Sequence, residues 1–195
     1  QLSVSWLPVS LAGLVIGAVF ILPYLLFSAT SGQLAEKYAH PVIMRWVKNC
    51  EIGIMALAAV GFMTEQAAVL LACTFLMGLH STVFGPVKYS YLPRVLDEHE
   101  LTGGNGMTEM GTFVAILLGN VAGGLLVAVP DIGHATVAVA CVAVAVFGRW
   151  MSGRIPPLSP THPEQTINWN PITETLHNLG LARANAKVFQ TLLGI

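Results

Sequence analysis

SGQLAEKYAHP, residues 31–41, separates two long apolar runs of the chain. No Asp, Glu, Lys or Arg occurs in residues 1–35, and a second largely apolar run begins directly after Pro41. Each run is long enough to cross the ~30 Å hydrocarbon core of a bilayer as an α-helix. The stretch therefore predicts the tight, charged turn of a helical hairpin embedded in a membrane.

The composition supports the same conclusion. Charged residues make up 10% of the chain and apolar residues 54%, whereas soluble domains contain roughly 25% charged residues. A soluble core of this size could not bury so much apolar surface. The formal net charge of −1 gives no general attraction to nucleic acid, so no nucleic-acid partner is expected.

The cysteines are isolated and odd in number, and they lie among apolar neighbours: Cys50, Cys73 and Cys141. They offer neither a disulfide framework nor a CxxC metal pair. We therefore predict that they are buried as small hydrophobic side chains. No metal ion or cofactor is predicted.

The apolar runs predict five membrane-spanning helices, at about residues 10–32, 42–63, 67–87, 104–129 and 134–150. Serines and a proline in residues 1–8 suit a loop before the first of them. A proline-rich polar stretch at 152–185 predicts a linker with one short helix around residues 172–181. Apolar character returns at residues 186–195, where we expect the start of a sixth span.

Five crossings place every basic residue on one side of the membrane. The loops on the other side, around residues 63–67 and 129–134, contain no Lys or Arg. Because Lys and Arg near helix ends remain in the cytoplasm, this side is expected to be cytoplasmic. The nine basic residues are Lys37, Arg45, Lys48, Lys88, Arg94, Arg149, Arg154, Arg183 and Lys187. Arg45 and Lys48 are expected to extend outward to the interface.

The fourth span carries small residues at every fourth position: Gly111, Ala115, Gly119 and Gly123. Small residues at this spacing allow close approach between membrane helices. The stripe therefore predicts a helix-packing face.

The turn between the first two spans resembles the cytoplasmic loop motif of the major facilitator superfamily. Gly32, Leu34, Ala35 and Lys37 match the motif, and Glu36 stands where Asp is usual. The resemblance implies the N-terminal half of such a transporter without its first helix. It also implies that Gly32, Leu34, Glu36 and Lys37 act at the conformational gate, the alternative being a solvated turn.

Two further segments, FGPVKYSYLP (84–93) and GGNGMTEMGTFVAILLG (103–119), resemble the lysophospholipid transporter family. The stretches NWNP (168–171) and ARAN (182–185) resemble its entry into the second half. The resemblance implies a bacterial inner-membrane transporter that moves lysophospholipid, chiefly lysophosphatidylethanolamine, to the cytoplasmic leaflet for reacylation. Its implied partners are membrane lipids, a C-terminal bundle and an acyltransferase, either fused or separate.

On this interpretation residues 1–151 form the membrane helices of the N-terminal bundle. Residues 152–185 form the linker between bundles, and residues 186–195 begin the C-terminal bundle.

Four residues are candidates for substrate binding. Lys88 could hold a phosphate, the alternative being an anchor at a helix end. Glu109 lies in a membrane span, where an acid is by default a functional candidate. It could meet the amine, pair with Lys88, or change protonation, the alternative being a structural salt bridge. Asn105 could cap the fourth span or bind ligand, with capping favoured. Tyr89, next to Lys88, completes the set.

Two other functions are compatible with the sequence. One is a proton-coupled exporter of small amphiphilic compounds on the same scaffold. The other is a membrane-embedded enzyme using Glu109 and His80, although no catalytic spacing supports it and a non-enzymatic role is expected. His80 lies in an apolar run and is expected to be an interior histidine with its hydrogen bonds satisfied.

Overall fold

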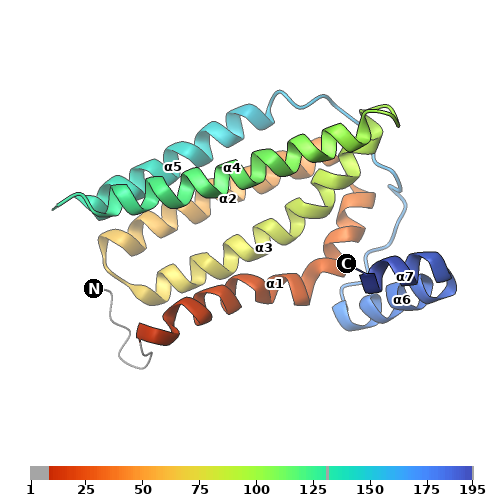
Figure 1. Cartoon of the computed structure of the whole chain (residues 1–195), viewed down its shortest axis with the longest axis horizontal. Coiled ribbons are helices and arrows are strands. Elements are labelled where there is room, and N and C mark those ends of the chain that lie inside the picture. Colours follow the sequence, from red (N-terminus) through yellow and green to blue (C-terminus); the bar gives the residue numbers. More distant parts are fainter. Residues whose placement is uncertain (1–8, 131, 195) are drawn as a thin grey trace.

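The computed structural model describes residues 9–130 and 132–194, and its regular structure there is entirely helical. The elements are α1 (Val9–Lys37), α2 (His40–Met63), α3 (Ala67–Tyr91), η1 (Leu92–Arg94), α4 (Leu101–Val127), α5 (Gly133–Ser152), α6 (Pro171–Ala184) and α7 (Ala186–Gly194). Helices α1 to α5 are long and apolar enough to cross a membrane, which confirms the predicted all-α membrane fold (Figure 1). The loop predicted at residues 1–8 lies outside the described residues, as do Asp131 and Ile195.

The turn after the first span is much shorter than predicted. Helix α1 continues through Ser31 and Gly32 to Lys37, and only Tyr38 and Ala39 separate it from α2. The side chains of Ser31 and Gln33 are buried at this end of the helix and that of Glu36 is exposed, so the stretch accommodates its polar groups without leaving helical geometry. Pro41 lies in the first turn of α2, where proline is tolerated because the backbone amide there has no partner within the helix.

The five long helices alternate in direction, and most of the charged residues lie at one end of the bundle. The carboxyl ends of α1, α3 and α5 lie at this end together with the amino ends of α2 and α4 (Figure 1). Helices α6 and α7 lie beside the same end, where α6 packs on α1. The nine Lys and Arg residues lie in these segments, in η1 or in the linker after α5. We refer to this as the basic end.

Helix α3 packs against both α1 and α2, and α2 packs in turn against α5. The tightest approach between α1 and α3 is at Gly78, where an added Cβ would collide with the carbonyl oxygen of Phe20. A buried apolar cluster near the basic end joins α1, α2 and α3 through Ala35, Val47 and Val87. Close contact at small residues and interdigitated aliphatic side chains therefore hold the three helices together.

Gly78→Ala is expected to destabilise the bundle. Overpacking of this kind typically costs about 1–3 kcal/mol, so the thermal midpoint of the detergent-solubilised protein should fall. Gly85→Ala on the same helix is the matched control, because no heavy atom lies within 4 Å of its added Cβ. Equal midpoints for the two variants would contradict the close approach. Thermal unfolding followed by size-exclusion chromatography measures both.

The linker between α5 and α6 is fastened to the basic end. The backbone amides of Thr161 and His162 donate to the carbonyl oxygen of Glu36 over 3.2 and 2.9 Å. Gln33 accepts from the amide of Asn168 over 2.7 Å and donates back to its carbonyl oxygen over 3.4 Å. The linker is thus bonded to the end of α1 at two places.

The short helix predicted in the linker is present as α6 and extends over residues 171–184. The side chain of Asn170 caps it by accepting from the amides of Ile172 and Thr173. The predicted domain boundaries fall at helix ends, since α5 ends at Ser152 and α7 begins at Ala186. The assignment of α7 to a second bundle stays a prediction.

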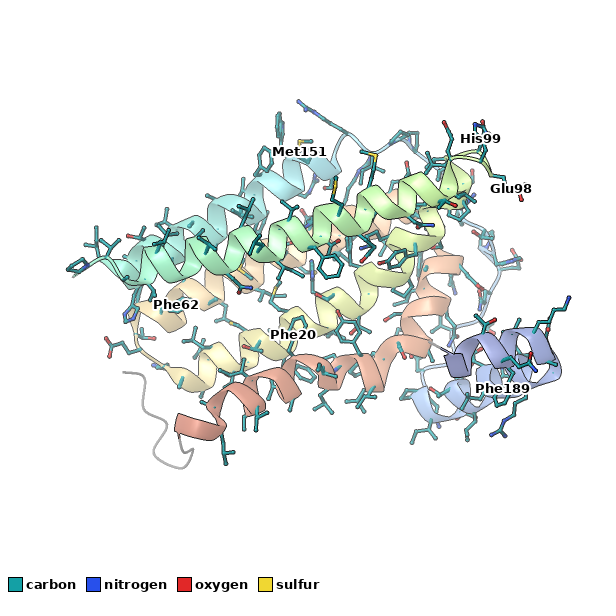
Figure 2. All side chains as sticks on the ribbon, in the orientation of Figure 1. Phe20, Phe62, Glu98, His99, Met151 and Phe189 are labelled. Carbon is teal, nitrogen blue, oxygen red and sulfur yellow. The ribbon has the colours of Figure 1, made fainter. Side chains whose placement is uncertain are left out.

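The small-residue stripe on α4 does not pack within the part of the chain that the structure describes. No heavy atom lies within 4 Å of a Cβ built at Gly111, Gly119 or Gly123. Helix α4 contacts α5, η1 and little else, and most of its side chains are uncovered (Figure 2). The packing face on α4 therefore stays a prediction, because the spacing indicates a face without identifying what covers it.

Candidate functional site

Three of the four predicted substrate-binding residues come together near the basic end, between α3 and α4. Lys88 Nζ donates to Oε1 of Glu109 over 3.3 Å and to Oγ1 of Thr112 over 3.5 Å. The Tyr89 hydroxyl donates to the same oxygen of Glu109. Lys88 Nζ also lies 4.5 Å from the centroid of the Tyr89 ring, within cation–π range. We call Lys88, Tyr89, Glu109 and Thr112 the Lys88 cluster.

The Lys88 cluster is open rather than sealed. The Glu109 side chain is 41% exposed and that of Lys88 is 22% exposed. Thr112 was not predicted, although it follows Glu109 by three positions and so shares its helix face. The cluster presents a cation, an anion and a hydroxyl group in one open site.

Asn105 does not cap α4, so this prediction is wrong. The helix begins at Leu101, with Glu100 in the N-cap position. The Glu100 amide donates to the Asp97 carbonyl oxygen over 2.9 Å and closes a turn directly before the helix. The helix therefore starts before Gly103 and Gly104. Asn105 is therefore an exposed residue within α4, one turn before Glu109 on the same face.

A second polar cluster joins α2 and α3 deeper in the bundle. Lys48 Nζ donates to Oε2 of Glu51 over 2.6 Å, and His80 Nε2 lies 3.2 Å from the same oxygen. The side chains are 23%, 13% and 8% exposed, respectively. We call these three residues the Glu51 cluster. Lys48 therefore turns toward a buried acid instead of extending outward, contrary to prediction.

His80 is buried as predicted, but its hydrogen bonds are not satisfied. Neither ring nitrogen makes a hydrogen bond in the described residues, although Nε2 is close to Glu51. The ring stacks on Phe84 at 6.3 Å between centroids. Lys48 Nζ lies 5.7 Å from the centroid of the same Phe84 ring.

The two clusters share one face of α3. His80, Phe84 and Lys88 are spaced four residues apart, so they follow one another on successive turns. The spacing of Lys48 and Glu51, three positions apart on α2, was visible in the sequence. Their approach to His80 was not, because it depends on how α2 and α3 are rotated against each other.

A cavity of about 610 Å³ lies between α2 and α3, within the range typical of ligand sites. Its lining is apolar except for Tyr38 and His80, and Trp46 and Cys50 face it from α2. Cys50 is exposed here, Cys73 is buried and Cys141 is half-buried. The predicted burial is therefore correct for Cys73 and wrong for Cys50.

The four residues of the predicted gate lie in the last two turns of α1. The side chain of Glu36 is exposed, and Lys37 Nζ lies 5.9 Å from the centroid of the Tyr38 ring. Gly32 and Leu34 are half-buried. Of these four residues, Glu36 is hydrogen-bonded to the linker within the described part of the chain, through its backbone carbonyl.

His40 joins the start of α2 to the end of α3 at the basic end. Arg94 can only donate, so Nδ1 of His40 accepts from Arg94 Nη1 over 3.3 Å and Nε2 carries the proton. Nε2 donates to Ser90 Oγ over 2.8 Å, while Ser90 Oγ donates to the Pro86 carbonyl oxygen. Arg94 also donates to Thr161 of the linker over 3.2 Å.

Five antiparallel apolar helices, with an ion pair between α3 and α4, define a multi-pass membrane protein. Among residues 9–130 and 132–194, no group of three or more His, Cys, Asp or Glu side chains could hold a metal ion. The sequence profile of the Major Facilitator Superfamily matches residues 5–194, so the chain belongs to that superfamily.

Curated relatives are about one third identical to this chain over the aligned residues. The chain is 32% identical over 162 residues to the lysophospholipid transporter LplT of Escherichia fergusonii, covering 83% of this chain and 38% of the relative. It is 32% identical over 158 residues to the proteins of the same name from Escherichia coli O7:K1 and Shigella boydii serotype 18, covering 80% of this chain and 37% of each relative. The chain thus spans less than two fifths of these relatives. No solved structure matches it.

Proposed function

We propose that the protein is part of a transporter that moves lysophospholipid across the bacterial inner membrane. The observation that carries this proposal is the Lys88 cluster, in which a cation and an anion are paired and open between two membrane helices. Superfamily membership and the likeness to proteins named lysophospholipid transporter support it. We assign the basic end to the cytoplasm by the bias of Lys and Arg.

The proposed substrate is lysophosphatidylethanolamine, delivered to the cytoplasmic leaflet for reacylation by an acyltransferase. Its head group has an anionic phosphate and a cationic amine. Lys88 and the Tyr89 hydroxyl can donate to phosphate oxygens, and Glu109 can accept from the amine. Asn105 lies one turn nearer the cytoplasm and could contact the head group as it leaves. The C-terminal bundle would complete the cavity, since binding sites of such folds lie between the two halves.

Uptake by cells tests the proposal. Spheroplasts that produce the full-length protein should take up radiolabelled lysophosphatidylethanolamine faster than spheroplasts without it. Equal uptake in both would overturn the proposed function. Export of small amphiphiles that stops when the proton gradient is dissipated, together with no effect on lysolipid, would support the proton-coupled alternative.

We also propose that Gly32, Leu34, Glu36 and Lys37 hold the cytoplasmic end closed at one stage of the transport cycle. The support is that the linker, which joins the halves in such transporters, is bonded to the Glu36 carbonyl and to Gln33. A movement of either half can therefore reach this end of α1 through the linker.

Gln33→Leu is expected to loosen the linker. The change removes two hydrogen bonds, each worth about 0.5–1.5 kcal/mol. Hydrogen exchange at the amides of residues 161–168 should become about tenfold faster, because 1.4 kcal/mol corresponds to about a factor of ten. Glu36→Gln is the matched control, since it alters the gate charge but keeps the backbone carbonyl that the linker binds. Unchanged exchange in Gln33→Leu would contradict the contact.

A further inference from the structure

The Glu51 cluster lies close to the middle of the membrane. Glu51 follows the first residue of α2 by 11 positions, and His80 precedes the last residue of α3 by 11 positions. At ~1.5 Å per residue, both are ~16 Å from the basic end, about half of the ~30 Å hydrocarbon thickness. Ionisable groups at this depth mark substrate or ion pathways by default. The Lys88 cluster is nearer to the surface.

The charges of the Glu51 cluster are balanced within it. Lys48 and Glu51 neutralise each other at 2.6 Å. A ligand with a single charge would release one partner and leave the other buried and uncompensated, which is strongly unfavourable. A ligand with both charges can replace both partners at once. The pair therefore favours a zwitterion over an anion or a cation.

His80 shows that this cluster has unused binding capacity. Its side chain is 92% buried, Nδ1 has no hydrogen-bond partner in the described residues, and Nε2 faces only Oε2 of Glu51, at 3.2 Å. His80 also forms part of the wall of the 610 Å³ apolar cavity between α2 and α3. One residue thus connects a polar centre to a cavity suited to an alkyl chain.

The Glu51 cluster repeats the chemistry of the Lys88 cluster. Each has one Lys, one Glu and an aromatic ring beside the ammonium group, Phe84 in one case and Tyr89 in the other. Both lie along the row of α3 that carries His80, Phe84 and Lys88. A head group leaving one centre would meet a similar centre two turns further along the same helix.

We propose that the Glu51 cluster is a second, deeper binding station for a zwitterionic phosphate–amine head group. Lys48 and His80 donate to the phosphate, Glu51 accepts from the ammonium group, and the acyl chain enters the cavity between α2 and α3. This inference rests on the proposed function. It adds a site near the middle of the membrane and a preference for zwitterionic lysolipids.

The test compares two lysolipids in spheroplasts that produce the full-length protein. One is zwitterionic lysophosphatidylethanolamine and the other is anionic lysophosphatidylglycerol. Glu51→Gln removes the negative charge that pairs with the ammonium group and leaves Lys48 free for phosphate. It should lower the uptake ratio of zwitterionic to anionic lipid at least tenfold. Glu98→Gln, an exposed acid in the loop before α4, is the matched control and should leave the ratio unchanged (Figure 2).

Other outcomes decide against the proposal. An equal fall for both lipids, or no change for either, would show a structural ion pair and overturn the second station alone. Absence of uptake by the unmodified protein would overturn the proposed function and the station with it. The double variant Lys48→Met with Glu51→Leu removes both charges together and avoids an unpaired buried charge. If this variant takes up both lipids as fast as the unmodified protein, the second binding station is also overturned.

Discussion

Glu109→Gln in the full-length protein is expected to reduce lysophosphatidylethanolamine uptake by at least about tenfold. The change keeps the size of the side chain and lets it still accept from Tyr89. It removes the negative charge that we assign to the amine. A hydrogen bond to a charged group is worth about 1.5–3 kcal/mol, and each 1.4 kcal/mol is about a factor of ten in affinity. Insertion into the membrane should stay normal, because the site is open and Glu109 is 41% exposed.

The control for this variant is Glu98→Gln, which removes an exposed acid at the same end of the bundle. Its uptake should match that of the unmodified protein. Uptake is measured in spheroplasts with radiolabelled lipid, and protein level by immunoblot of the membrane fraction. Unchanged uptake in Glu109→Gln would remove Glu109 from the proposed site. A fall matched by an equal fall in protein level would identify the ion pair as structural.

The membrane spans could be predicted from the sequence to within a few residues in most cases, since runs of apolar residues are a direct signal. The larger errors concern polar residues that remain helical. Ser31 to Lys37 were predicted to form a turn but complete α1, and Gly103 and Gly104 were placed at or before a helix start but lie inside α4. At the end of α1 the side chain of Gln33 is buried and bonded to the linker and that of Glu36 is exposed, so these polar groups need no turn.

The site could be predicted only in part. The pairing of Lys88 with Glu109 was one of several alternatives, because the two residues are close in sequence and lie on consecutive helices. The inward direction of Lys48 and its link to His80 depend on the rotation of α2 against α3, which periodicity alone does not define. The stripe on α4 shows the same limit, since its spacing predicts a contact surface but not the partner.

Exchanging the charges of Lys88 and Glu109 separates an ion pair that holds helices together from one that binds substrate. Lys88→Glu alone places two acids beside each other, and breaking a buried pair costs about 3–5 kcal/mol. Because this pair is partly exposed, we expect a smaller loss, seen as a lower protein level and no measurable uptake.

Adding Glu109→Lys to Lys88→Glu restores opposite charges across the α3 and α4 interface, so the protein level should recover. Uptake should not recover, because the cation no longer lies over the Tyr89 ring and the anion no longer accepts from the Tyr89 hydroxyl. Recovery of uptake together with protein level would show that any ion pair suffices here, and that the phosphate and amine of the substrate bind elsewhere. Radiolabelled uptake normalised to the amount of membrane protein distinguishes the two results.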